Sequence, residues 1–345
     1  MDMIEFLKSG AIISLTSDHL LVGWGKTRKK DNLNPAFYFS EFFLNGNSPW
    51  IQYSNWEEIS VGDFKKQLRI TSLGTCDWTI EHPERFKYTF DELSQLFQKN
   101  LLKKAVPYVF AVSQQQMTIS RLQNCLNRAL DMIGQNAGYL YGYWNEKKGI
   151  LGITPEYLFI HSQLEPKKVY TMALAGTHPP YQNQQSFLRN EKEQYEHQLV
   201  VEGICQSLES LGIVTIGNTR LHKLPKLTHL MTPIEVDLNH SFHFDFLVEK
   251  LHPTPALGAF PKEKGKKWLE EYQIHTPREY YGAPIGFIYP QKGISKCLVG
   301  IRNVQWNTSN MRIGAGCGVV RQSSFEKEWQ EIHFKIRSIR DCLYL

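Results

Sequence analysis

The chain has 345 residues, of which 42% are hydrophobic and 21% charged, and its formal net charge is +5. These values are ordinary for a globular protein, so they exclude a disordered chain, and no apolar run approaches the roughly eighteen residues of a transmembrane helix. The basic residues are scattered, which argues against a nucleic-acid-binding face and suits an anionic small substrate. Six well-separated cysteines without a CxxC pair, and no recognisable secretory leader, predict a cytoplasmic protein with reduced thiols.

The first hundred residues predict β-hairpins followed by one helix. Residues 11–25, "AIISLTSDHLLVGWG", place two apolar, β-rich runs around a polar turn, which is typical of a hairpin. A helix is expected from about residue 91 to about residue 103. No Pro-, Gly- or Ser-rich linker interrupts the sequence, so we expect a single domain over residues 1–345.

Two later segments share one plan of three strands and a helix. Aromatic and β-branched residues lie between turn signals in both segments, which indicates antiparallel meanders. The expected strands cover residues 138–144, 150–160 and 168–176 before a helix at about 190–211, and residues 283–289, 297–306 and 311–320 before a helix that includes 326–337. Runs of antiparallel strands followed by helices predict an α+β fold.

Each of these two predicted helices carries a pair of carboxylates beside its apolar stripe. Glu193 and Glu196 are three residues apart on the first helix, as Glu328 and Glu331 are on the second. Either pair alone fits a solvated helix flank, and Glu331 could simply pair with Lys335. If both pairs point into one interior, four carboxylates need a compensating cation, and ligation by oxygen alone favours Mg²⁺ or Mn²⁺.

Eight motifs between residues 104 and 343 follow one another in a recognisable order and spacing. They are "ALAGTH" (173–178), "EKEQYEHQLVV" (191–201), "LPKLTHLMTPIEVDL" (224–238), "LHPTPALGAFPK" (251–262), "REYYGAPIGF" (278–287), "GIRNV" (300–304), "GAGCGVV" (314–320) and "FEKEWQEIHFK" (325–335). Together they resemble the chorismate-utilising enzymes, which include anthranilate, aminodeoxychorismate, isochorismate and salicylate synthases.

The resemblance implies the fold of anthranilate synthase component I. That fold is a single large domain of antiparallel sheets, with a β-sandwich-like core flanked by helices. Residues 101–343 would then form the catalytic part that carries the motifs, and residues 1–100 a shortened N-terminal part.

The resemblance also implies roles for individual residues. Glu196 and Glu331 would bind Mg²⁺ directly, with Glu193 and Glu328 behind them, acting through water. Arg302 would pair with the enolpyruvyl carboxylate of chorismate, because a planar guanidinium matches a carboxylate. The other substrate-binding residues would be Gly176, Thr177, His229, Thr254, Tyr281, Gly316, Gly318 and Lys335. Taken alone, the glycines could equally mark a strand bulge, and the histidine could be a buried core residue.

The reaction depends on which nucleophile reaches the ring. In the lysine-type aminodeoxychorismate enzymes a lysine precedes the glycine of the "GT" pair, and this chain has Ala175 there. Isochorismate and salicylate synthases use water, a lysine base and a carboxylic acid, for which the matching residues are Lys104 and Glu156. Lys103 is an alternative base. The "HPTPA" pattern favours isochorismate synthases, so we expect addition of water at C2 with acid-assisted loss of the C4 hydroxyl.

Three alternatives stay open at this point. They are a salicylate synthase, an ammonia-using anthranilate or aminodeoxychorismate synthase, and a catalytically silent chorismate-binding homologue. Water chemistry needs no glutaminase subunit, so we expect a monomer that acts on free chorismate and uses Mg²⁺ as its cofactor. Its product would feed menaquinone, a siderophore or another pathway, which the sequence does not specify.

Overall fold

Two antiparallel sheets form the centre of the molecule in the computed structural model, which describes residues 1–46, 48–135, 137–178, 187–225 and 227–345. The first sheet has the order β5 (Thr79–Ile80), β7 (Tyr108–Ser113), β19 (Met311–Gly316), β18 (Asn303–Asn307), β9 (Lys148–Thr154), β8 (Tyr139–Trp144), β1 (Gly10–Ser14), β2 (His19–Arg28) and β4 (Trp50–Ser60). The second has the order β4, β3 (Ala36–Phe39), β16 (Pro284–Tyr289), β17 (Ile294–Val299), β10 (Tyr157–Ser162), β11 (Lys168–His178) and β14 (Thr228–Leu238).

Shorter strands complete the two sheets and form a third. Both β12 (Gly212–Ile216) and β13 (Arg220–Lys223) pair with β14, one after the other along its length. The strand β4 belongs to both large sheets, because Trp50 and Ile51 pair with β3 while the rest of the strand pairs with β2. A small third sheet has the order β15 (Ala259–Phe260), β6 (Lys104–Ala105) and β20 (Val319–Val320).

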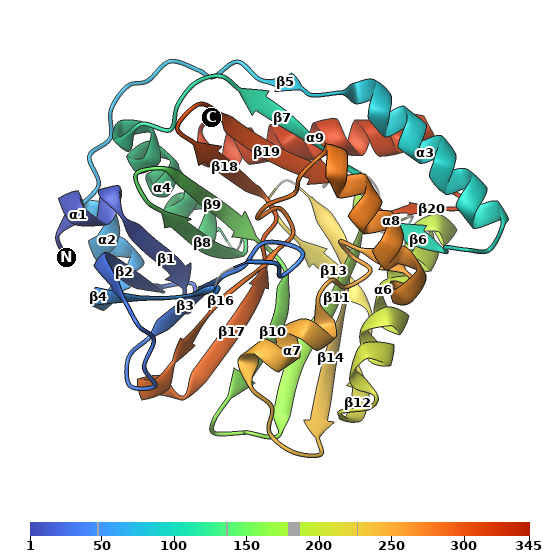
Figure 1. Ribbon diagram of the computed structural model, residues 1–345, viewed down its shortest axis with the longest axis horizontal. Helices are drawn as coiled ribbons and strands as arrows, with labels where there is room; N and C mark the ends of the chain where they lie inside the picture. The colour runs from blue at the N-terminus through green and yellow to red at the C-terminus, as the bar shows by residue number, and fades with distance from the viewer. Residues whose placement is uncertain (47, 136, 179–186, 226) are drawn as a thin grey trace.

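Helices cover the outer faces of the two large sheets. Figure 1 shows α4 and α9 along one side of the strands and α6 and α7 on another. The helices are α1 (Met3–Lys8), α2 (Val61–Lys66), α3 (Pro83–Gln98), α4 (Ile119–Ile133), α6 (Glu191–Leu208), α7 (Phe244–Leu251), α8 (Lys262–His275) and α9 (Phe325–Leu343), with a 3₁₀ turn η1 (Pro290–Lys292). None of the described helices is long and apolar enough to cross a membrane.

The core lies in three layers, which explains why many strands are apolar on both faces. In β1, Ala11 and Ile13 point into the cluster between the sheets, whereas Ile12 points into the cluster under the helices. Strands buried on both faces lose the alternation of apolar and polar residues. The predicted α+β fold, with a β-sandwich-like core flanked by helices, is confirmed.

Three strands that the sequence predicts as continuous are each interrupted. The expected strand 150–160 breaks into β9 and β10, 297–306 into β17 and β18, and 311–320 into β19 and β20. At the first two breaks the chain leaves one large sheet and enters the other, since β9 pairs with β18 and β10 with β17. The two crossings therefore lie side by side.

The predicted helix boundaries are partly right. The helix expected at 91–103 begins earlier, at Pro83, a residue well suited to the first helical position, and ends before Asn100, whose φ is +52°. The helix expected at 190–211 is α6, and the side chain of Asn190 caps it by accepting a hydrogen bond from the backbone N–H of Glu193 at 3.2 Å.

Candidate active site

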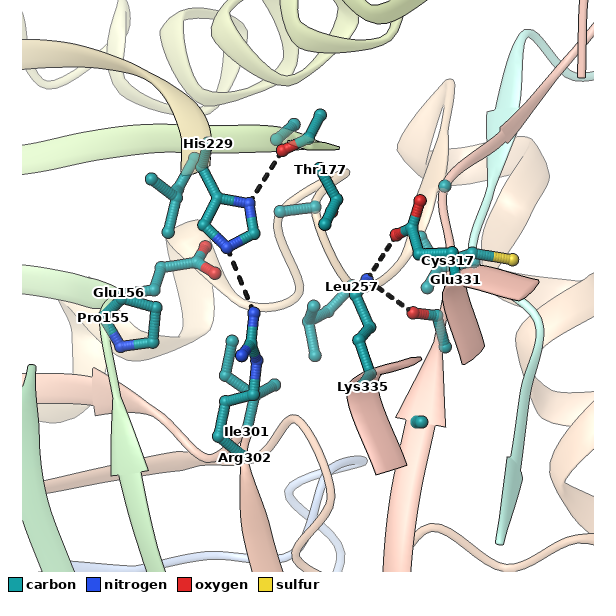
Figure 2. A pocket seen from close by; sticks show the side chains of 18 of the residues that line it. Pro155, Glu156, Thr177, His229, Leu257, Ile301, Arg302, Cys317, Glu331 and Lys335 are labelled. Atoms are coloured by element: carbon teal, nitrogen blue, oxygen red, sulfur yellow. Dashed lines mark hydrogen bonds and ion pairs between the residues drawn. The ribbon is translucent and has the colours of Figure 1, made fainter. Parts of the chain in front are cut away.

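A cavity lies where the interrupted strands meet the N-terminal part of α6 and the middle of α9. Figure 2 shows side chains from β11, from β14, from the two crossing segments and from α9 around it. Its polar and glycine lining consists of Glu156, Gly176, Thr177, Glu196, His229, Tyr281, Arg302, Gly314, Gly316, Gly318, Glu331 and Lys335, and apolar residues such as Pro155, Leu257 and Ile301 complete the wall.

At one end of this cavity, three carboxylates surround a single ammonium group. The Lys192 Nζ lies 3.2 Å from Glu193 Oε1, 2.9 Å from Glu196 Oε2 and 3.0 Å from Glu328 Oε1. Burial lowers the pKa of Lys192, but the three carboxylates outweigh this effect and raise it. The predicted convergence of α6 and α9 carboxylates on one interior therefore occurs, with a lysine among them.

A second lysine approaches the same cluster from the small third sheet. The Lys104 Nζ lies 3.1 Å from Glu196 Oε1, and the Lys104 side chain is only 1% exposed. Burial would raise the pKa of Glu196, but Lys104 and Lys192 together hold it well below its usual range. The neighbouring Lys103 is exposed, with its ammonium over the ring of Phe260, so only Lys104 of the two candidate bases reaches the site.

Two glycines are required by these charged side chains. A Cβ on Gly318 would lie 1.9 Å from Glu196 Oε1, so no other residue fits without moving that carboxylate. Gly176 has φ +74°, and a Cβ there would lie 2.9 Å from Glu193 Oε2. This backbone path brings the N–H of Thr177 to 3.2 Å from the same oxygen, to which it donates a hydrogen bond.

The α9 side of the cavity carries its own ion pair. The Lys335 Nζ lies 2.6 Å from Glu331 Oε1 and donates a hydrogen bond to the carbonyl oxygen of Gly316 at 2.8 Å (Figure 2). Burial lowers the pKa of Lys335, but Glu331 outweighs this effect and raises it. An ammonium held in this way faces the cavity as a fixed positive charge.

At the opposite end, Glu156 is buried without a partner. The residue is 2% exposed, and its carboxyl group makes no hydrogen bond or ion pair with any residue of the described chain. Burial raises its pKa to about 8, against a smaller opposing effect of Lys104 and Lys335. At neutral pH this carboxyl group therefore carries a proton that faces the cavity.

His229 joins two walls of the cavity and is held in one tautomer. Its Nδ1 lies 2.7 Å from the carbonyl oxygen of Gly176, and its Nε2 lies 3.1 Å from the Arg302 guanidinium (Figure 2). A carbonyl only accepts and a guanidinium only donates, so the proton is on Nδ1 and the ring is neutral. Burial and the nearby Arg302 charge lower the pKa of His229, which agrees with this assignment.

Arg302 projects into the cavity from a strained backbone. Its φ is +57°, which is uncommon for a residue with a side chain, and it lies where the chain crosses from β17 to β18. The loop is fixed by Asn303, whose amide donates to the carbonyl of Gly300 at 2.7 Å and to the hydroxyl of Tyr141 at 2.9 Å. That hydroxyl donates to the carbonyl of Ile301 at 2.7 Å.

The structure brings most of the predicted site residues together. Of the four carboxylates, Glu196 and Glu331 line the cavity, while Glu193 and Glu328 lie behind them, against Lys192. Thr254 does not line the cavity; its backbone carbonyl accepts hydrogen bonds from Leu257 and Gly258 instead. Lys104 reaches the site through Glu196 rather than through the cavity wall.

Sequence reasoning missed two cations. Lys192 lies four residues before Glu196 on a predicted helix, and this spacing could have indicated the ion pair. Arg278 is 1% exposed and donates to the carbonyls of Val106 and Leu257, two residues of the cavity wall. It has aromatic rings on its faces in place of a carboxylate, and no local pattern predicts that arrangement.

The donor set suits a hard divalent cation, although no described group of three or more acidic, histidine or cysteine side chains forms an open metal cage. Ammonium groups contact these carboxylates, since Lys192 lies within 3.2 Å of Glu193, Glu196 and Glu328. Carboxylate oxygens are the ligand type that Mg²⁺ prefers, so the fit lies in the kind of ligand and not in a preformed geometry.

Comparisons with known proteins identify a family and a fold. The sequence pattern of the family described as "Chorismate binding enzyme" matches residues 54–344. The isochorismate synthase MenF of Bacillus subtilis (strain 168) is 32% identical over 218 residues, which are 61% of this chain and 45% of the relative. The chain thus spans less than half the length of that relative.

Two solved structures have the same fold. One is MenF, the menaquinone-specific isochorismate synthase from Escherichia coli, with a TM-score of 0.81 and 17% identity over 99% of this chain and 91% of the other. The second is anthranilate synthase component I from Streptococcus pneumoniae TIGR4, with a TM-score of 0.73 and 16% identity over 91% of this chain and 82% of the other. The predicted likeness to anthranilate synthase component I is confirmed for the fold.

Proposed function

Because the chain belongs to the family of chorismate-binding enzymes, we propose that it is a magnesium-dependent isochorismate synthase, which converts chorismate to isochorismate. The proposal is supported by the relative that carries this name and by the division of the cavity into a charged end and a protonated end. The observation that carries it furthest is the buried carboxyl group of Glu156, which makes no hydrogen bond or ion pair among the described residues. Burial raises its pKa to about 8, which favours the protonated form at neutral pH.

Chorismate carries two carboxylates, and the cavity offers a cationic group at each of two positions. Arg302 would pair with the enolpyruvyl carboxylate through its planar fork, since His229 contacts one of its nitrogens and fixes its direction. The hydroxyl of Tyr281 and the backbone of Gly316 and Gly318 would surround the same group. The ring carboxylate would lie toward Lys335, whose ammonium faces the cavity from the other side.

Four glutamates would hold the magnesium ion. Glu196 and Glu331, which line the cavity, would bind it directly, and Glu193 and Glu328 would act through water. The ion would supply positive charge to the ring carboxylate and fix the position of the ring.

The proposed reaction moves one proton at each face of the ring, away from the attacking water at one face and onto the departing hydroxyl at the other. Lys104 takes a proton from water, and the water oxygen bonds to C2 as the ring double bond shifts. The bond from C4 to its hydroxyl breaks, and Glu156 gives its proton to the departing oxygen, so that water leaves. One water enters and one leaves, and the overall reaction is an isomerisation. The Lys104 Nζ lies 3.1 Å from Glu196 Oε1, so its action as a base requires that this contact opens and that the amine is unprotonated.

The lining argues against covalent attack on the ring by a lysine. Ala175 lies in the cavity wall directly before Gly176, so no lysine is present at that position. With water as the proposed nucleophile, the reaction needs no glutaminase subunit, and a cytoplasmic monomer acting on free chorismate is sufficient.

Product analysis with two matched variants tests the proposal. The protein is incubated with chorismate and MgCl₂, and the products are separated by chromatography; isochorismate is the expected product. Lys104→Gln should lower turnover by about 10² to 10⁴, the usual contribution of a general base, while chorismate still binds. The control Lys103→Gln removes an exposed neighbouring charge and should turn over normally.

Each other outcome redirects the proposal. Salicylate and pyruvate as products would identify a salicylate synthase, and anthranilate formed with ammonia would identify an aminating enzyme. Saturable binding of chorismate without any product would identify a silent homologue. Full activity of Lys104→Gln would show that Lys104 is not the general base.

A further inference from the structure

Lys192 occupies the centre of the carboxylate cluster and has no role in the proposed reaction. Its ammonium contacts Glu193, Glu196 and Glu328, which come from two different helices, α6 and α9. Both oxygens of Glu196 are engaged by ammonium groups, Oε1 by Lys104 at 3.1 Å and Oε2 by Lys192 at 2.9 Å. The cluster is thus already supplied with positive charge.

A divalent cation cannot simply be added to this arrangement. With Lys192 in place, the ion and the ammonium would compete for the same oxygens at about 3 Å, where like charges repel strongly at low dielectric. At least one oxygen of Glu196 has to be released before it can coordinate a metal. The cation that leaves must be Lys104 or Lys192.

Exposure separates these two lysines. The Lys192 side chain is 17% exposed and lies in the first turn of α6, so its four-carbon chain can swing toward solvent. The Lys104 side chain is 1% exposed and is held on β6, between β15 and β20. Movement of Lys104 would require the small sheet to open, whereas movement of Lys192 requires only new side-chain rotamers.

We propose that Lys192 is a tethered counter-ion, which keeps the carboxylates of α6 and α9 together before a metal arrives and which the metal displaces when it binds. This inference rests on the proposed magnesium dependence. Metal binding is then an exchange of one cation for another. Because the contacts of the ammonium group have to be broken, the apparent affinity for the metal is weaker than it would be without Lys192. In return, the three carboxylates that Lys192 contacts are assembled in advance instead of repelling each other.

Calorimetric titration with MgCl₂ alone, without chorismate, tests the exchange. The variant Lys192→Met keeps the length of the side chain and removes its charge. We expect it to bind Mg²⁺ at least about tenfold more tightly than the unaltered protein, a typical size for coupling between two ligands. In EDTA its melting temperature should fall by several degrees, because three buried carboxylates lose their cation, and MgCl₂ should restore it.

The control variant is Lys103→Met, which removes one exposed positive charge outside the cluster. It should match the unaltered protein in both affinity and melting temperature. Equal Mg²⁺ affinity of Lys192→Met and the control would overturn the inference.

Crystal structures with and without MgCl₂ provide a second test, which does not depend on any variant folding. With the metal bound, the Lys192 ammonium should have left Glu196. An ammonium that still contacts all three carboxylates beside a bound ion would contradict the inference. These measurements use the metal alone, so they are separate from the test of the proposed reaction, which is the formation of isochorismate from chorismate and MgCl₂.

Discussion

The two ends of the cavity shift the pKa of a glutamate in opposite directions. Glu196 and Glu156 are both glutamates, and their exposed fractions are 6% and 2%. Glu196 lies between the ammonium groups of Lys104 and Lys192, which hold its pKa well below the usual range. Glu156 has no such contact, and burial raises its pKa to about 8. At neutral pH one is a carboxylate and the other a carboxylic acid.

The difference shows that partners, more than burial, decide the chemical role of a glutamate in this protein. Removal from water disfavours the charged form of both residues, but two ammonium groups reverse that effect for Glu196. A cation site needs ionised oxygens, whereas protonation of a leaving hydroxyl needs a proton that is held until it is used. The cavity provides both within one lining.

Among changes to the cavity lining, the largest expected effect comes from replacing the carboxylate of Glu196 with an amide. Glu196→Gln should lower magnesium-dependent turnover by about 10³, since a bound metal ion contributes several kcal/mol to the stabilisation of charge in the transition state. Rates at saturating chorismate over a range of MgCl₂ concentrations measure it. Glu191→Gln, at an exposed position of the same helix, is the matched control. A Glu196→Gln variant with full turnover would show that this carboxylate has no part in the reaction.

A smaller effect is expected where a substrate carboxylate would be bound. Arg302→Lys keeps the positive charge but loses the planar fork and the contact with His229 Nε2. We expect KM for chorismate to rise by roughly 10- to 100-fold, with a smaller change in kcat, because the loss of one bidentate contact costs about 1.5–3 kcal/mol. Steady-state kinetics separate the two constants. An unchanged KM would place the enolpyruvyl carboxylate elsewhere.

The smallest effect concerns stability at the protonated end. The pKa of Glu156 is about 8 in the folded protein, above its value in an unfolded chain, so the folded state binds this proton more tightly. The resulting contribution to stability is complete below about pH 4.5 and is lost as the pH rises to about 8. A glutamine does not ionise, so the stability of Glu156→Gln does not fall for this reason as the pH rises. Relative to the unaltered protein, the variant should therefore gain a few kcal/mol of stability at most between about pH 4.5 and 8.

Urea unfolding at several pH values measures this difference. The variant Glu146→Gln, altered at an exposed glutamate of the turn between β8 and β9, controls for the loss of a carboxylate as such. A stability difference between Glu156→Gln and the unaltered protein that does not change with pH would mean that Glu156 is ionised in the folded state.

The sequence predicted the layers of the fold better than the interruptions that create the site. Patterns of apolar residues report burial, and buried residues lie on both sides of Pro155, Ile153 in β9 and Leu158 and Phe159 in β10. The departure of the chain from one sheet to the other depends on tertiary pairing with β17 and β18, which no local pattern encodes. For the same reason, the positive φ of Arg302 could not be foreseen.

The candidate site was also only partly predictable from the sequence. The spacing of Glu193 and Glu196, and of Glu328 and Glu331, predicted two facing carboxylate pairs, and the structure brings them to one cavity. The roles of individual residues came from the resemblance to a family. Spacing on the helix could have indicated the contact of Lys192 with Glu196, but not its contact with Glu328, which joins positions that are distant along the chain.

The central claim is that one end of the cavity binds the charged groups of the substrate and the metal, while the other end donates a proton during addition of water. Transfer of oxygen from the solvent into the product tests this claim most directly. The protein is incubated with chorismate and MgCl₂ in oxygen-18 water, and the product is isolated and analysed by mass spectrometry. We predict isochorismate that carries the heavy oxygen in its C2 hydroxyl, with the original C4 oxygen lost to solvent. Isochorismate without the label, or no isochorismate at all, would contradict the account.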